Sequence, residues 1–132
     1  MRFIRTITLL VAALTATLLG LSVAPSQAAP SVGQTAAVQY HVVNNLSAGE
    51  IRNSGKFKVS GNAITYKGKK VILQRKNPGG SWRTYTRKAT SVTTGHFRIR
   101  FDGRCGSAWR IVLKASGPYA KTTIKIGKIR CY

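Results

Sequence analysis

Acidic residues are almost missing from this chain: Glu50 and Asp102 are the only two among 132 residues, against 22 lysines and arginines. A glycosidase needs two carboxyl groups around one bond. Each of these two stands beside a glycine in an expected loop, which disfavours that class. The net charge is +20. Repulsion among so many positive charges destabilises a compact fold. We therefore expect the charge either to bind an anionic partner or to prevent aggregation between copies of the protein.

Long apolar runs are missing after the first 28 residues. At the start of the chain, two arginines precede an apolar stretch over residues 7–23, and Ser26-Gln27-Ala28 places small residues at the −3 and −1 positions of a cleavage site. We expect residues 1–28 to be a cleaved secretory signal peptide, which leaves no transmembrane segment and a secreted, extracellular protein. The remainder keeps 20 basic residues and both acids, a net charge of +18.

Cysteine and histidine are scarce, with two of each. Two thiols and the distant His41 and His96 lack the spacing of metal ligands, so we expect no metal, and no motif indicates a cofactor. An even pair of cysteines in an exported chain indicates one disulfide, between Cys105 and Cys131. We expect this bond to stabilise a small single domain.

Helical periodicity is missing too, and short β-rich runs take its place. Residues 29–53 are expected to be a lead-in with one strand over 38–43, followed by an aperiodic loop. From residue 54 to 132, alternating runs are separated by turn signals every 8–12 residues, which is typical of a sandwich or barrel. Asn77-Pro78-Gly79-Gly80 is the clearest hairpin signal, and Gly61-Asn62 is expected to end a strand. We therefore predict an all-β fold.

The last run, over residues 122–131, has an irregular pattern. Ile124 and Ile126 share one parity, whereas Ile129 has the opposite one. A β-bulge at Gly127 is expected to give them a common inward face.

Four segments resemble a known pattern when they are read in order. They are 68–75 (GKKVILQR), 79–84 (GGSWRT), 94–97 (TGHF) and 109–110 (WR). Together they resemble small immunoglobulin-like β-sandwich domains of secreted bacterial proteins, which carry motifs such as "G-x-x-V-x-L-Q-R" and "G-G-x-W-x-T". The resemblance covers about 54–127 and implies an antiparallel sandwich of about seven short strands. It supplies no catalytic residue.

Basic residues alternate with apolar ones on almost every expected strand, so neighbouring strands are expected to build a positive sheet face. Such a face attracts polyanions by counterion release, without base readout. We expect a non-enzymatic module that binds a cell-envelope glycan such as teichoic acid, extracellular nucleic acid or another anionic surface. The expected binding residues are Lys56, Lys58, Lys67, Lys69, Lys70, Arg75, Lys76, Arg98, Arg100, Arg110, Lys114 and Lys125.

Aromatic residues stand among these cations and would add stacking if they were exposed. Trp82 and Trp109 occupy expected core positions. Tyr66 and Tyr85 are the better candidates for exposure.

Two alternatives remain open. A secreted protein-binding or inhibitory module would present the rigid loop over 77–80. A small cationic ribonuclease would use His41, His96 and Glu50 as acid and base, with lysine or arginine on the phosphate, although their spacing is not diagnostic.

Overall fold

Strands make up the regular structure of residues 36–132, the part of the chain that the computed structural model describes; the expected signal peptide lies outside it. No helix within these residues is long and apolar enough to cross a membrane. The strands are β1 (Gln39–Tyr40), β2 (Val43–Glu50), β3 (Lys56–Ala63), β4 (Lys70–Lys76), β5 (Trp82–Ala89), β6 (His96–Asp102), β7 (Ala108–Leu113), β8 (Tyr119–Ala120) and β9 (Thr122–Lys128).

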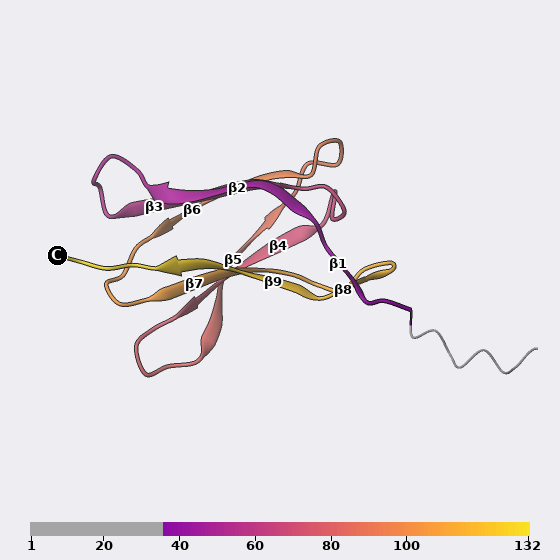
Figure 1. Ribbon diagram of the computed structural model, residues 1–132. Helices are drawn as coiled ribbons and strands as arrows, with labels where there is room; N and C mark the ends of the chain where they lie inside the picture. The colour runs from indigo at the N-terminus through magenta and orange to yellow at the C-terminus, as the bar shows by residue number, and fades with distance from the viewer. Residues whose placement is uncertain (1–35) are drawn as a thin grey trace, which may run out of the picture. The chain divides into compact units, whose positions relative to one another are not determined.

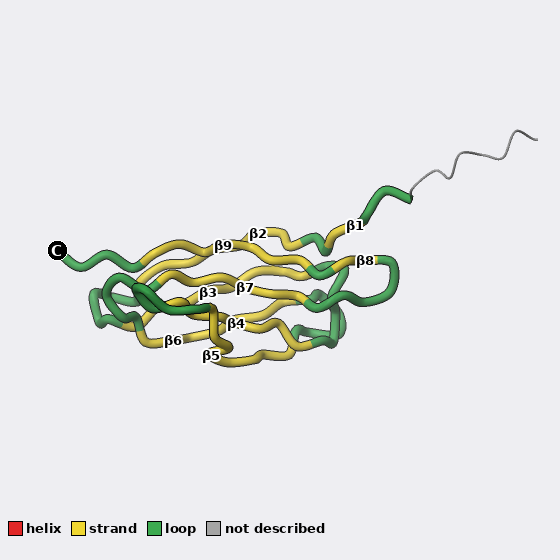
Figure 2. Tube along the Cα trace, turned by 90° about the horizontal axis from the view of Figure 1, so that it is seen from below, coloured by secondary structure: helices red, strands yellow, loops and turns green. Residues whose placement is uncertain are grey.

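Seven of these strands form two antiparallel sheets, in the orders β2-β3-β6 and β5-β4-β7-β9. In Figure 1 the layer of β2, β3 and β6 lies above the layer of β4, β5, β7 and β9. Figure 2 shows the strands of both layers running lengthwise between two groups of loops. The remaining strands, β1 and β8, form a short parallel pair. The predicted all-β sandwich of about seven strands is confirmed.

The core lies between the two layers and follows the expected alternation. Along β6, Phe97, Ile99 and Phe101 are buried while the residues between them are exposed. Trp109 on β7 is the largest fully enclosed side chain and packs its ring 4.2 Å from that of Phe101, centroid to centroid. The two-residue period of the sequence therefore identifies the inward face of these strands correctly.

The predicted bulge in β9 is also confirmed. Trp109 pairs with Gly127, but the next residue of β7, Arg110, pairs with Lys125, so one extra residue is inserted in β9. Gly127 adopts φ +149°, which favours glycine. As a result, isoleucines from both sides of the bulge pack against the core.

The prediction of an aperiodic loop after residue 43 is wrong. Residues 43–50 form β2, which pairs with β3 and packs Val43 and Leu46 against the core. A register shift between Asn44 and Ser47, with Asn45 at φ 51°, interrupts the two-residue period and hides the strand in the sequence. Residues Val38 to Tyr132 form one compact unit, so the sandwich begins before residue 54.

Gly61-Asn62 does not end a strand either, since β3 continues to Ala63. A Cβ atom at Gly61 would lie 3.2 Å from Val43 Cγ1 and 3.3 Å from Leu46 Cδ1. This glycine therefore makes room for the side chains of β2 and does not form a turn.

Two further predictions are confirmed, a turn and a disulfide. In the β4–β5 hairpin, the Gly80 N–H donates to the Asn77 carbonyl over 3.0 Å, and Gly79 has φ +69°, as a type II turn after proline requires. The disulfide joins Cys105 to Cys131 with their Cα atoms 5.6 Å apart. It connects the β6–β7 loop to the segment after β9.

Candidate functional site

The outer face of the three-stranded sheet carries four of the expected binding residues. Lys58 and Arg100 lie directly opposite each other on β3 and β6, and Arg98 lies opposite Ser60. Lys56 lies opposite Asp102, so an acid stands among these cations. Both acids of the chain, Glu50 and Asp102, belong to strands of this sheet.

The outer face of the four-stranded sheet has a different charge balance. Strands β4, β5, β7 and β9 contain no aspartate or glutamate. Pairing across β4, β7 and β9 aligns Lys76, Ala108 and Lys128 in one row. The next row contains Gln74, Arg110 and Lys125. Cations of three strands are thus neighbours on a face whose strands carry no carboxylate.

Arg110 is held in place from two sides on this face. Its Nε donates to Gln74 Oε1 over 2.8 Å, and its guanidinium carbon lies 4.2 Å from the centroid of the Trp82 ring. A guanidinium over an indole is attracted by the ring's electron-rich face. Arg110 therefore fixes Trp82, which is half-buried on β5, against the outside of the sheet.

A shallow hollow of about 500 Å³ lies next to this pair. Lys76, Lys125 and Lys128 surround it together with Trp82, and the Asn77–Gly79 turn closes one side. Ala108 lies between Lys76 and Lys128 in the row described above, and its small side chain leaves the space open. The side-chain oxygen of Asn77 is buried and has no hydrogen-bond partner within residues 36–132. The hollow thus combines an aromatic ring with three ammonium groups.

The remaining predicted binding residues are more scattered. Lys67 and Lys69 lie in the turn between β3 and β4, with the Lys69 ammonium 5.7 Å from the Tyr66 ring. Lys70 begins β4, and Lys114 is exposed just after the end of β7. These four are separate from the hollow, because none of them lines it.

Arg75 is the one predicted binding residue that turns toward the interior. It is half-buried, and its guanidinium lies 5.5 Å from the Tyr85 ring and 5.9 Å from the Trp109 ring. The two-residue period explains this position, since Arg75 has the same parity in β4 as the buried Leu73.

The aromatic predictions are partly wrong. Trp109 is buried as expected, but Trp82 is on the outer face and Tyr66 is only 4% exposed. Tyr85 is partly exposed, yet its ring packs edge-on against Trp109 at 5.1 Å between centroids. Trp82, which the sequence placed in the core, is therefore the aromatic residue that lies on the outer face of the four-stranded sheet, beside Lys76.

Lys128 and Arg87 also belong to the outer face but were not predicted as binding residues. Arg87 pairs with Ile72, whose side chain points outward from β4. The sequence alone could have identified the outward position of Lys128, because the predicted bulge at Gly127 places it on the same face as Lys125. The outward position of Arg87 could not be identified in this way, because it depends on the register between β5 and β4.

The three residues of the ribonuclease alternative do not form one site. His41 is 4% exposed, and its Nε2 donates to the Lys114 carbonyl over 3.0 Å. His96 is exposed on the outer face of the three-stranded sheet, with Nδ1 3.0 Å from Asn62 Oδ1. Glu50 lies at the far end of β2, on the order of 25 Å along the chain from His41. No group of three or more His, Cys, Asp or Glu side chains able to hold a metal ion occurs in residues 36–132.

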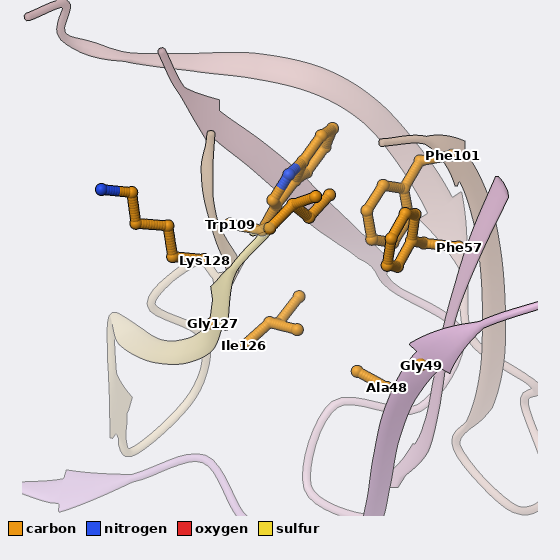
Figure 3. Close-up of a pocket in the computed structure, with 9 residues that line it drawn as sticks. Ala48, Gly49, Phe57, Phe101, Trp109, Ile126, Gly127 and Lys128 are labelled. Carbon is orange, nitrogen blue, oxygen red and sulfur yellow. The ribbon is translucent and has the colours of Figure 1, made fainter. Parts of the chain in front are cut away.

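A second, smaller cavity of about 180 Å³ opens between β2 and β9. Figure 3 shows the rings of Phe57, Phe101 and Trp109 grouped on one side of it, while the Lys128 side chain extends away from them. The lining is mainly apolar, so this cavity offers little to a charged ligand.

No protein-family model, curated protein or solved structure matches this chain.

Proposed function

We propose that this protein is a secreted, immunoglobulin-like β-sandwich that binds anionic polymers, mainly through the outer face of its four-stranded sheet. The observation that best supports this proposal is a cluster of cations on strands that contain no acidic residue. Its members are Lys76, Arg110, Lys125 and Lys128. The polymer is a cell-envelope glycan such as teichoic acid, or extracellular nucleic acid.

The strand order supports the immunoglobulin-like part of this proposal. Counting only the seven strands of the two large sheets, the first, second and fifth form one sheet and the other four form the second. The third, sixth and seventh are adjacent in the second sheet, as the C, F and G strands are in immunoglobulin-like sandwiches. The fourth strand pairs with the third, as C′ does.

Secretion is supported by two independent features. The apolar stretch over residues 7–23 is followed by a suitable cleavage site. The disulfide between Cys105 and Cys131 is of a kind that persists in oxidising compartments.

Charge-driven binding makes a specific prediction about salt. A polymer that contacts several lysines and arginines releases its counterions, so affinity for heparin, DNA or purified cell wall is expected to fall steeply between about 50 and 200 mM NaCl. Titration at several salt concentrations measures the slope of log affinity against log salt. An affinity that hardly responds to salt would contradict the proposal and favour the protein-binding module.

Two matched variants test which face binds. One changes Lys76, Arg110, Lys125 and Lys128 to glutamine, and the other makes the same change at Lys56, Lys58, Arg98 and Arg100. Both lose four charges, but we expect the first to reduce the salt slope by about 3 and the second by less than about 1. Equal reductions would contradict the assignment to the four-stranded sheet.

A further inference from the structure

We propose that the hollow beside Trp82 binds one acidic sugar unit of a polysaccharide, so that the polymer is an anionic glycan and not a nucleic acid. This inference rests on the proposed function and names the ligand class of the same face. A hollow of about 500 Å³ is within the size range of small-ligand sites, and it contains both apolar and polar groups.

The ring of Trp82 provides the apolar contact. Arg110 covers part of the indole and holds it, so the ring needs little ordering when a ligand arrives. The other two aromatic residues of this sheet, Tyr85 and Trp109, pack against each other on its inner side. Trp109 also borders the hollow, but it is only 2% exposed and offers no ring face to a ligand. The outer face therefore offers one ring for one ligand unit.

The lysines provide the charge recognition. Lys76 and Lys128 flank Ala108 in the row across β4, β7 and β9, so their Cα atoms are about 10 Å apart. Lys125, in the adjacent row, lines the same hollow. An ammonium group is a flexible point charge, which suits the carboxylate, sulfate or phosphate group of an acidic sugar.

One feature favours a sugar over a nucleobase. Sequence-indifferent binding of single-stranded nucleic acid uses several aromatic side chains for successive bases, whereas this face has only Trp82.

The test compares oligogalacturonate, which carries one carboxylate per sugar, with an oligothymidylate of equal charge, by calorimetry in 50 mM NaCl. Removing the ring in Trp82→Ala is expected to weaken oligogalacturonate binding at least tenfold and oligothymidylate binding less than twofold. Val92→Ala, which shortens an exposed apolar side chain in the β5–β6 loop, is the control and is expected to change neither.

A second variant keeps every charge and aromatic ring. Ala108→Leu fills the hollow and is expected to weaken oligogalacturonate binding at least tenfold as well. Ala89→Leu adds the same side chain at an exposed position at the end of β5 and is the control, expected to have no effect. Urea unfolding of each variant identifies any loss of folding, and Ala108→Leu keeps the test decisive if Trp82→Ala unfolds.

The outcomes separate the two proposals. If both folded variants bind oligogalacturonate as well as the wild type does, or if both polymers lose affinity equally, the sugar site is refuted while charge-driven binding stands. If the wild type binds neither polymer in 50 mM NaCl, the proposed function itself fails.

Discussion

At the scale of single residues, the two histidines differ entirely in role. The His41 ring lies between Tyr66 and Tyr119, at 4.7 and 5.0 Å between centroids. Its two ring nitrogens lie 3.1 Å from Thr65 Oγ1 and 3.0 Å from the Lys114 carbonyl oxygen. Its backbone N–H donates to Thr122 Oγ1 over 2.8 Å. His41 therefore joins the first residues of the sandwich to the β8–β9 region and has no access to a substrate.

We expect His41→Ala to lower the free energy of unfolding by about 2–4 kcal/mol, because it leaves a cavity and an unpaired, partly buried carbonyl. The exposed His96 is the matched control, and His96→Ala is expected to change stability by no more than about 0.5 kcal/mol. Urea unfolding measures both. Similar effects at the two positions would contradict a structural role for His41.

Trp82 shows why a single residue can be misassigned from sequence. Thr86 lies opposite Leu73 and so faces inward, and in a regular strand Trp82 would share its face. The pairing shifts between Leu73 and Gln74, so Thr84 is the next partner and Tyr85 is an extra residue. This bulge reverses the parity and turns Trp82 outward. The sequence contains no glycine at this point to indicate the bulge.

At the scale of elements, irregular strands build the candidate site. Register shifts occur in β2, β5 and β9, which are all edge strands of their sheets. The shift in β5 turns Trp82 outward, and the one in β9 brings Lys125 and Lys128 to the same face. Bulges commonly redirect side chains at sheet edges. The hollow thus depends on two bulges whose strands lie on opposite edges of one sheet.

The disulfide secures the end of β9, next to one of these bulges. It closes a loop between positions 26 residues apart. The Cys105→Ser/Cys131→Ser variant is expected to lose about 3.5 kcal/mol of unfolding free energy, because the unfolded chain gains freedom. Urea unfolding of the variant and the wild type gives the difference. A variant as stable as the wild type would show that this bond does not stabilise the fold.

At the scale of the whole molecule, charge opposes folding. All but two of the 22 basic residues lie within residues 36–132, where the two acids offset little of their charge. The folded sandwich holds these cations closer together than the unfolded chain does, so repulsion is greater in the folded state. Each lysine that lines the hollow adds to this cost in the absence of a ligand.

We therefore expect salt to stabilise the free protein. Raising NaCl from about 10 to 300 mM shortens the Debye length from about 30 Å to less than 8 Å and screens the repulsion. The urea midpoint is expected to rise with salt, and urea is the suitable denaturant because it carries no charge. A midpoint that is constant or falls would show that repulsion does not limit stability.

Much of the fold follows from the sequence, because turn residues and a two-residue period act locally. The all-β class, the Asn77–Gly80 turn, the inward face of β6 and the Gly127 bulge were all predicted correctly. The single pair of cysteines left one possible disulfide, and it is present. Local chemistry is sufficient for these features.

Only the tertiary structure decided which residues share a face. Strand β2 has no regular period, and Trp82 changes face through a bulge that depends on how β5 pairs with β4. The row of Lys76, Ala108 and Lys128 combines β4 with β7 and β9, two strands that follow it more than 30 residues later in the sequence. Pairing between strands sets such rows, since the register of a strand is fixed by its neighbour and by the core it covers. Composition predicts a cationic surface, but register places three of its lysines around one tryptophan.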